Sequence, residues 1–290
     1  MTFEPSRRIR RFNRAVTSAL GLLDDAFLGR GRPLGVARVL NGIGRGHARV
    51  ADLRAFLAID SAALARHLRA LEAEGLLSIA PDPVDARARI AFLTEAGEAE
   101  FAAYERLADD HARTLLDGRR DADAILAAMD LVATALGPAP RIETVAPDDP
   151  DAIRCLDAYY ADLATRLGTG YDPALAGRVE VAALSPPMGA FLLARTDDLP
   201  VGCVAVKGTG GTTGEIKRLW VSPSARGQGL ARRLMEGAED AARALGLATL
   251  RLDSNSALTE AAALYRASGW HEIARYNDDP YPDLFFEKSL

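Results

Sequence analysis

The chain has 290 residues, a length that favours two domains over one. Hydrophobic residues make up 49% and charged residues 26% of it, which is typical of a globular protein and excludes a disordered one. Residues 1–138 contain 19 Arg and 19 acidic residues, so the net charge of −5 lies in the remainder. Composition alone therefore does not indicate nucleic-acid binding by the first half.

No apolar run approaches the ~20 residues that a membrane helix needs. The basic start, MTFEPSRRIRRFNR, has no apolar stretch behind it, which argues against a secretory signal. Cys155 and Cys203, the only cysteines, fall in different predicted elements and indicate neither a disulfide framework nor a zinc site. We expect a cytoplasmic protein that uses no metal and binds no membrane.

The first half of the chain has helical periodicity, with apolar residues at three- and four-residue spacing. One stretch instead predicts a β-hairpin, with Pro81 and Pro83 marking its turn. The predicted helices are 12–28, 48–59, 61–77, 94–118 and 121–136, and the hairpin is 79–93. Helix, helix, hairpin, helix is the order of a winged helix-turn-helix domain. Prolines clustered at 138–150 end this half, so we place the domain boundary between 139 and 140.

The helix predicted at 61–77 has two unlike faces. Leu64, Leu68 and Leu71 are expected to face the core, and Ser61 is expected to cap the helix. Small residues and arginines remain on the exposed face, which suits the major groove of DNA, and arginines of the hairpin are expected to reach phosphates or the minor groove. The predicted DNA-binding residues are Ser61, Ala62, Arg66, Arg69, Arg87 and Arg89.

The stretches IDSAALARHLRALEAEGLL (59–77) and VDARARIAFLTEAGEAEF (84–101) resemble the MarR family of winged helix-turn-helix regulators. The resemblance covers most of the first half. It implies that double-stranded DNA binds through residues 48–93 and that the terminal helices, near 7–28 and 100–136, form a homodimer.

Two positions depart from the MarR pattern. Ala65 stands where the family usually has a hydroxyl residue, and the hairpin tip at 81–85 is acidic where basic residues are common. A half that serves mainly as a dimerisation frame or a ligand sensor is therefore the alternative.

The second half alternates between strand and helix patterns. The predicted strands are 141–146, 189–195, 201–207, 215–221, 248–253, about 270–276 and 283–288, and the predicted helices are 150–167, 227–245 and 259–268. Strands that precede a strand–helix–strand–helix unit imply an α/β domain with a mixed sheet.

A glycine-rich turn, ARGQGLA (225–231), lies between a predicted strand and a predicted helix. A helix N-terminus binds anions through unpaired backbone N–H groups, and Gly227 and Gly229 let the backbone approach an oxygen-rich ligand. Arg226 adds positive charge, so the turn favours a phosphate or diphosphate site. A tight turn without a ligand is one alternative. A dinucleotide site is another, although Arg232 stands where that fingerprint needs a small residue.

The run from Val221 to Ala231 resembles the acetyl-CoA signature of the GNAT superfamily of N-acyltransferases, whose Arg/Gln-x-x-Gly-x-Gly/Ala core is matched here by Arg226, Gly229 and Ala231. The resemblance extends over 141–290. It includes ALYRASGWHEIARY (263–276), which is similar to a second family motif that contains a tyrosine near the coenzyme sulfur. The implied fold is an α/β GNAT domain with a mixed, splayed sheet.

The GNAT resemblance implies roles for individual residues. Backbone groups at the end of the splayed strand would bind pantetheine and polarise the acetyl carbonyl, the turn would hold the diphosphate, and an asparagine after the next strand would reach the pantetheine arm. The implied acetyl-CoA-binding residues are Leu219, Trp220, Val221, Arg226, Gly227, Gln228, Gly229, Leu230, Ala231 and Asn255. Tyr265 would donate a proton to the leaving thiolate.

An amine acceptor is protonated at pH 7 and must lose a proton before it attacks the thioester. Glu215, on the strand that leads to the thioester, is the candidate base, although an exposed carboxylate beside Lys217 would give the same sequence. We expect a bifunctional regulator and N-acetyltransferase acting on a small amine or amino acid. The alternatives are a regulator whose second half only senses acyl-CoA, and a protein lysine acetyltransferase.

Overall fold

The computed structural model describes residues 4–85, 87–167, 181–197 and 199–290. The chain divides into two compact units, Met1–Ala122 and Asp123–Leu290. All of the helix α6 (Ala122–Leu136) except its first residue therefore groups by its contacts with the second unit. The domain boundary expected between 139 and 140 stays a prediction.

The amino-terminal unit is a set of helices with one two-stranded antiparallel hairpin. Its elements are α1 (Pro5–Ala19), α2 (Leu34–Gly44), α3 (Val50–Leu57), α4 (Ser61–Ala73), β1 (Leu77–Pro81), β2 (Arg89–Leu93) and α5 (Glu95–Leu116). The hairpin pairs Leu77 with Leu93 and Pro81 with Arg89, so the expected winged helix-turn-helix order is present.

The start of the chain differs from the sequence expectation. The single helix expected at 12–28 is α1, which ends at Ala19, followed by a turn with Gly21 at φ +57°. The helix α2 was not predicted, because three of its residues are glycines and its apolar residues are too dense to show a period. Packing against the core stabilises α2 where helix propensity does not: Val39 and Leu40 are fully buried.

The helix α4 packs as its pattern predicts but begins differently. Leu64, Leu68 and Leu71 are buried in the core of the unit. The N-cap is Asp60 and not Ser61: the Asp60 carboxylate accepts a hydrogen bond from the Ala63 N–H at 2.8 Å. An ionised cap is favoured there because the helix N-terminus carries partial positive charge.

The carboxyl-terminal unit is a seven-stranded mixed sheet with the strand order β3-β4-β5-β6-β7-β9-β8. The strands are β3 (Arg141–Val145), β4 (Gly189–Thr196), β5 (Leu199–Gly208), β6 (Thr213–Val221), β7 (Thr249–Ser254), β8 (His271–Glu272) and β9 (Leu284–Ser289). The helices after β3 are α7 (Pro150–Leu167), α8 (Leu230–Ala244) and α9 (Thr259–Ala267). Only β6 and β7 pair in parallel; every other strand pair is antiparallel.

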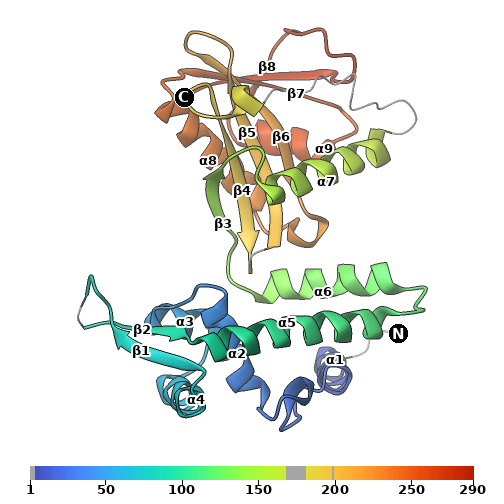
Figure 1. Ribbon diagram of the computed structural model, residues 1–290. Coiled ribbons are helices and arrows are strands. Elements are labelled where there is room, and N and C mark those ends of the chain that lie inside the picture. Colours follow the sequence, from blue (N-terminus) through green and yellow to red (C-terminus); the bar gives the residue numbers. More distant parts are fainter. Residues whose placement is uncertain (1–3, 86, 168–180, 198) are drawn as a thin grey trace. The chain divides into compact units, whose positions relative to one another are not determined.

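Helices cover both faces of this sheet (Figure 1). Successive strand residues point to opposite faces, so Leu192 and Val204 pack with α8 residues, whereas Phe191 and Cys203 pack with α7 residues. Burial on both faces explains why β4 and β5 are almost continuously apolar. It also brings the two cysteines together, since Cys155 of α7 lies in the same buried cluster as Cys203.

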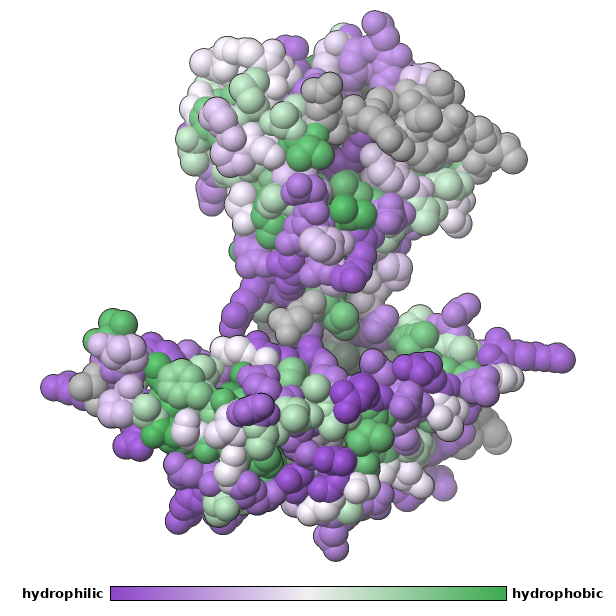
Figure 2. Space-filling model, in the orientation of Figure 1, coloured by the Kyte–Doolittle hydropathy of each residue, from purple (hydrophilic) through white to green (hydrophobic). Residues whose placement is uncertain are grey.

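The surface mixes hydrophilic and hydrophobic residues over the face seen in Figure 2. Large exposed apolar side chains recur along α6, where Leu126, Met129, Leu131 and Leu136 are between 39% and 83% exposed. No helix among the described residues is long and apolar enough to cross a membrane.

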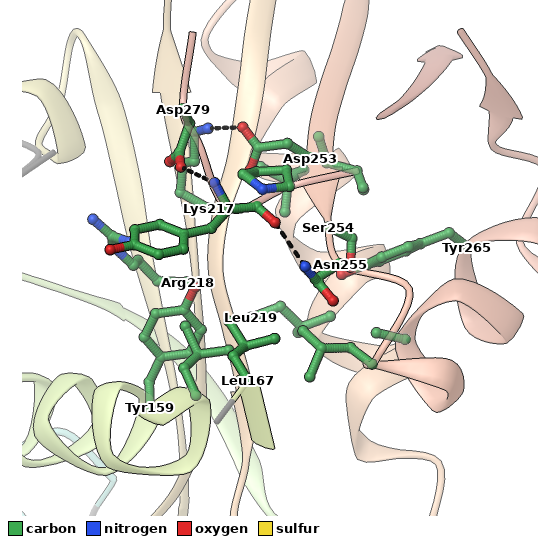
Figure 3. Close-up of a pocket in the computed structure, with 17 residues that line it drawn as sticks. Tyr159, Leu167, Lys217, Arg218, Leu219, Asp253, Ser254, Asn255, Tyr265 and Asp279 are labelled. Atoms are coloured by element: carbon green, nitrogen blue, oxygen red, sulfur yellow. Dashed lines mark hydrogen bonds and ion pairs between the residues drawn. The ribbon is translucent and has the colours of Figure 1, made fainter. Parts of the chain in front are cut away.

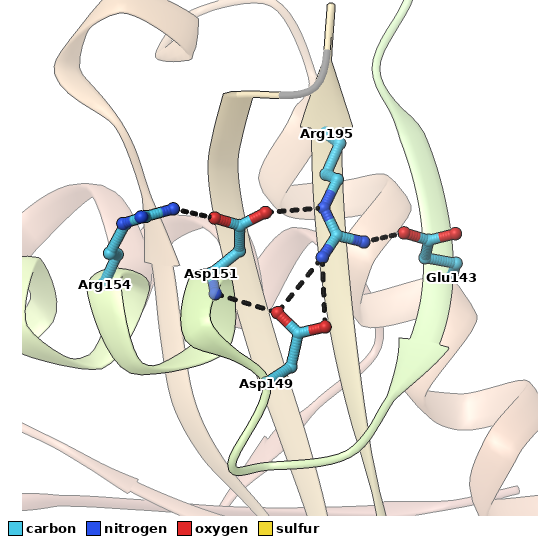
Figure 4. Close-up of polar contacts among 5 residues, drawn as sticks. All are labelled: Glu143, Asp149, Asp151, Arg154 and Arg195. Atoms are coloured by element: carbon cyan, nitrogen blue, oxygen red, sulfur yellow. Dashed lines mark hydrogen bonds and ion pairs between the residues drawn. The ribbon is translucent and has the colours of Figure 1, made fainter. Parts of the chain in front are cut away.

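A charge network holds the start of the second unit together (Figure 4). The Arg195 guanidinium on β4 donates to Asp151 at 3.0 Å and to Asp149 at 3.1 Å, and it also contacts Glu143 of β3. The side chain of Arg195 is only 21% exposed. One cation thus fixes β3 and the start of α7 to the same strand.

We predict that Arg195→Leu lowers the free energy of unfolding of this unit by about 1–3 kcal/mol, because it leaves partly buried carboxylates without their donor. Both tryptophans, Trp220 and Trp270, lie in this unit, so their fluorescence during urea unfolding measures it selectively. The matched control is Arg154→Leu, which removes an arginine that is 69% exposed and whose one ion pair within the described ranges is with Asp151. Equal destabilisation by the two variants would contradict the prediction.

Candidate functional site

The two parallel strands of the sheet separate soon after they meet. Pairing joins Thr213–Glu215 to Thr249–Arg251, yet β6 continues to Val221 and β7 to Ser254. The carboxyl-terminal parts of β6 and β7 therefore diverge and leave an opening in the sheet. This is the splayed geometry that the resemblance to N-acyltransferases predicts.

A β-bulge lies in β6 beside this opening. Cys203 pairs with Trp220 and Ala205 with Lys217, so β6 has one residue more than β5 at this point. Arg218 takes up the extra length with φ +60°, a conformation that L-residues rarely adopt. The Cys203 thiol donates to the Arg218 carbonyl at 3.3 Å, so the core supports the bulge from beneath.

A cavity of about 130 Å³ occupies the opening (Figure 3). Its lining comes from β6, β7, α7, α9 and the segment before β9, and it includes Leu219, Asn255 and Tyr265 from the predicted site. The Arg218 guanidinium also lines it and lies over the rings of Tyr159 and Tyr160, 5.7 and 5.1 Å from their centroids. The cavity therefore combines apolar walls with charged groups.

The other two predicted strand residues face away from the cavity. The Trp220 ring packs in the α7-side cluster, where its buried Nε1 has no partner in the part of the chain that the structure describes. Val221 is buried on the α8 side and pairs with Gly202 of β5. Any role of these two residues toward a ligand therefore rests on their backbone groups.

Tyr265 is held by an aromatic cluster. Its ring lies 6.3 Å from that of Trp270 and 5.4 Å from that of Phe286. Burial raises the pKa of the Tyr265 phenol well above its ordinary value, so it is protonated at neutral pH. A protonated phenol on the wall of the cavity is able to donate a proton to a leaving group.

Charged side chains of β6 and β7 meet on one face of the sheet. The Lys217 Nζ lies 2.6 Å from the Asp253 Oδ2 and 3.5 Å from the Glu215 Oε2. The Asn277 Nδ2 also donates to the Asp253 Oδ2, at 2.6 Å. We call Glu215, Lys217 and Asp253 the charged cluster. Lys217 and Asp253 line the cavity, whereas Glu215 lies behind Lys217 and is not part of the lining.

The glycine-rich turn leads directly into α8. Gly227 and Gly229 have φ of +76° and +77°, and a Cβ on either would meet nothing within 4 Å. Backbone conformation therefore requires the glycines, and the space before them is open. Gly229 is the N-cap of α8 and offers no side-chain cap, so the first N–H groups of the helix, beginning at Leu230 and Ala231, keep their capacity to bind an anion.

The Arg226 side chain fixes the turn from within. Its Nε donates to the Val221 carbonyl at 3.0 Å, and its Nη2 donates to the Asp162 carboxylate of α7 at 2.8 Å. The Gln228 side chain likewise donates to the Ser224 carbonyl, at 3.1 Å. These contacts shape the turn and leave anion binding chiefly to the backbone.

The Asn255 amide is engaged with the protein on both sides. Its Nδ2 donates to the Tyr281 carbonyl at 2.6 Å, and its Oδ1 accepts from the Ala257 N–H at 2.9 Å. Asn255 thereby holds the segment before β9 against the cavity.

The predicted DNA-binding side chains share an exposed surface in the amino-terminal unit. Ala62, Arg66 and Arg69 are exposed on α4, and Arg87 and Arg89 are exposed on the hairpin. Ser61, the first residue of α4, is exposed as well. Contact of these residues with DNA stays a prediction.

The acidic tip of the hairpin is largely neutralised. Asp82 is buried, accepts from the Val84 N–H at 2.8 Å and pairs with Arg49 at 2.8 Å. The Val84 N–H and, to a smaller extent, Arg49 hold the Asp82 pKa below its ordinary value. These acids therefore shape the hairpin and weigh less against DNA than the sequence alone indicates.

Sequence reasoning missed several residues around the cavity, among them Asp253 and Arg218. Lys217 shares a strand face with Glu215 because they are two residues apart, and the parallel register places Asp253 beside Lys217. Strand alternation could therefore have predicted that Lys217 lies beside Glu215. No sequence pattern could have predicted Asp162 as the partner of Arg226, because the two residues are distant in sequence.

Two family models match separate parts of the chain. The MarR family model matches residues 30–88, and the acetyltransferase (GNAT) family model matches residues 156–270. These matches agree with the winged helix-turn-helix order of the first unit and with the mixed, splayed sheet of the second.

Individual proteins resemble about half of the chain or less. An IAA acetyltransferase of Azospirillum brasilense is 38% identical over 139 residues, which are 47% of this chain and 86% of that protein. An uncharacterized N-acetyltransferase of Schizosaccharomyces pombe is 34% identical over 35% of this chain and 63% of its own length. A solved GNAT family acetyltransferase of Elizabethkingia anophelis with acetyl-CoA bound is 19% identical, with a TM-score of 0.40 over 52% of this chain and 98% of its own.

The GNAT family model matches the region that contains the opening in the sheet, the bulge and the glycine-rich turn. The Azospirillum brasilense relative is matched over most of its own length. Acetyl-CoA is the acyl donor of that family. The chain therefore belongs to the GNAT family of N-acetyltransferases and has a MarR-family region before its acetyltransferase region.

Proposed function

We propose that the chain transfers an acetyl group from acetyl-CoA to a small amine or amino acid, and that its first half binds double-stranded DNA as a homodimer. The observation that carries the enzymatic part is the small cavity at the divergence of β6 and β7. It places carboxylates and a protonated phenol beside the bulged strand. A small volume and lining carboxylates favour a compact, cationic acceptor.

Acetyl-CoA would bind along the opening. The backbone of Leu219–Val221 would pair with the pantetheine arm, and the N–H groups of residues 227–231 would hold the diphosphate at the start of α8. The arm would pass Asn255 on the cavity wall. Tyr265 would give a proton to the thiolate as it leaves, and the charged cluster that contains Glu215 would take the proton of the amine.

The DNA-binding part rests on the exposed arginines of α4 and the hairpin, together with the match to the MarR family. The exposed apolar side chains of α6, such as Leu131 and Leu136, support a dimer, because such residues are usually covered in a functional assembly.

The direct test of the enzyme is thiol release from acetyl-CoA by the full chain with a panel of amines, amino acids and a lysine peptide. A reaction without acceptor serves as the blank. Turnover with one small class supports the proposal. Turnover with the peptide alone would point to protein acetylation, and acetyl-CoA binding without any turnover would point to an acyl-CoA sensor.

Tyr265→Phe should lower turnover at least ~10-fold, because the variant keeps the ring but loses the proton donor. Affinity for acetyl-CoA should not change. Tyr276→Phe is the matched control, since the buried Tyr276 hydroxyl has no hydrogen-bond partner among the described residues and Tyr276 is not among those that line the cavity. Comparable turnover in the Tyr265→Phe variant and the unaltered chain would remove the acid role.

Gly229→Ala should weaken acetyl-CoA binding, measured as the dissociation constant by calorimetry. The matched control is Gly246→Ala: the two glycines have φ of +77° and +78°, and both face open space. Each variant should lose about 1–2 kcal/mol of stability through its left-handed backbone. Only Gly229→Ala should raise the dissociation constant, and an equal rise in both would exclude the turn as the binding site.

Arg66→Ala should reduce the affinity for random-sequence duplex DNA and lower the slope of log affinity against log salt by about one. Arg113→Ala is the control, because Arg113 is 75% exposed on α5, away from α4 and the hairpin. Fluorescence anisotropy across a salt series gives both quantities. An unchanged slope for Arg66→Ala would exclude a phosphate contact at this residue.

A further inference from the structure

The charged cluster contains two carboxylates, and only one of them reaches the cavity. Asp253 lines the cavity, with a side chain that is 12% exposed, whereas Glu215 does not line it. The Lys217 ammonium stands between the two, 2.6 Å from Asp253 and 3.5 Å from Glu215. A group that takes a proton from the acceptor must reach it directly or through one water, and of these two acids only Asp253 lines the space in which an acceptor would lie. Position therefore separates these two acids.

The two carboxylate oxygens of Asp253 differ in their hydrogen bonds. Oδ2 accepts from the Lys217 Nζ and from the Asn277 Nδ2, both at 2.6 Å. No described residue donates to Oδ1, even though the side chain is largely buried. One oxygen is thus fixed in place while the other keeps its lone pairs, so the carboxylate is oriented and still able to bind a donor.

A third carboxylate, Asp279, also lines the cavity. It belongs to the segment before β9, and its Oδ1 accepts from the Tyr281 N–H at 3.1 Å. Figure 3 shows that bond beside the Lys217–Asp253 pair. The Asp279 carboxylate is held by its own segment and not by the diverging strands. A substitution of Asp279 therefore serves as the control for the same substitution of Asp253.

We propose that Asp253 is the catalytic carboxylate that holds the ammonium of the acceptor and takes its proton, and that Glu215 acts only through Lys217 as a positioning residue. This inference rests on the proposed acetyl transfer. The role expected of Glu215 on β6 thereby passes to Asp253 on β7. Asp253 lies two residues beyond Arg251, the last residue of β7 that pairs with β6, and its carboxylate is 2.6 Å from the Lys217 Nζ.

Each proton that moves in the proposed step has a donor and an acceptor. The ammonium R–NH3+ gives one proton to the Asp253 Oδ1, and the neutral amine attacks the thioester carbonyl carbon. A C–N bond forms and the C–S bond breaks. The thiolate takes the proton of the Tyr265 hydroxyl, and the tyrosinate recovers a proton from the new amide nitrogen. Asp253 then releases its proton to solvent, so one amide, one thiol and one proton are formed.

Three isosteric variants of the full chain test the assignment: Asp253→Asn, Glu215→Gln and Asp279→Asn. The acceptor is whichever member of the panel supports turnover, the lysine peptide included. No turnover with any member would overturn the proposed acetyl transfer and this assignment with it. Asp253→Asn should lower kcat/KM for the acceptor by about a hundredfold or more, and Glu215→Gln and Asp279→Asn should each cause a loss at least about tenfold smaller than that. The dissociation constant of acetyl-CoA, measured by calorimetry, should be the same in all three.

A second readout separates proton transfer from structural damage. Aromatic amines and acyl hydrazides are largely neutral at pH 7 and need no initial deprotonation. The loss caused by Asp253→Asn should therefore shrink to below about tenfold with such acceptors. A larger loss in Glu215→Gln or in Asp279→Asn than in Asp253→Asn would overturn the proposal. So would a loss in Asp253→Asn that is independent of the basicity of the acceptor.

The two hypotheses fail in different ways. If only the lysine peptide is acetylated, the small-amine substrate class is wrong, and the Asp253 comparison is still made on the peptide. If a small amine is acetylated and Asp253→Asn is as active as the unaltered chain, the substrate class stands and the assignment of Asp253 is wrong.

Discussion

The second unit depends on one interruption in its hydrogen bonding: the parallel ladder between β6 and β7 stops at Glu215 and Arg251. Beyond that point the backbone of β6 has a strand partner on the β5 side only, within the part of the chain that the structure describes. Buried N–H and C=O groups without partners are costly, so a ligand that carries amides along its length is the natural complement. The pantetheine arm of acetyl-CoA is such a ligand.

The surrounding structure keeps this opening from collapsing. The bulge at Arg218 fixes the direction of β6, and the buried Cys203 thiol binds the carbonyl of the bulged residue. At the end of β6, Arg226 links the Val221 carbonyl to the Asp162 carboxylate of α7. The opening, the anion-binding turn and the helix that covers the sheet are thereby joined by short polar contacts. A site that is already formed loses less conformational freedom when its ligand binds.

Local sequence patterns predicted much of this architecture. The succession of strand and helix patterns, together with turn chemistry, located β3 to β7, and the glycine-rich turn located the start of α8. The helix α2 was missed because tertiary packing and not periodicity stabilises it, and the cap of α4 shifted by one residue because Asp60 is the better acceptor.

The sequence predicted some of the residues around the cavity and missed others. Glu215 and Tyr265 lie in recognisable motifs. The role of Asp253 can be inferred only from the structure, which brings it beside Lys217. The role of Asp162 can be inferred only from the packing of α7 on the turn. A contact across strands or helices leaves no periodic signal, so no reading of a single segment finds it.

Amide hydrogen exchange of the full chain, with and without acetyl-CoA, tests the central claim most directly, namely that the ligand binds in the opening between β6 and β7. The account predicts that acetyl-CoA slows exchange in peptides that cover residues 216–221 and 227–232, and leaves the hairpin at 77–93 unchanged. Slowed exchange elsewhere, with no change in these two stretches, would contradict it.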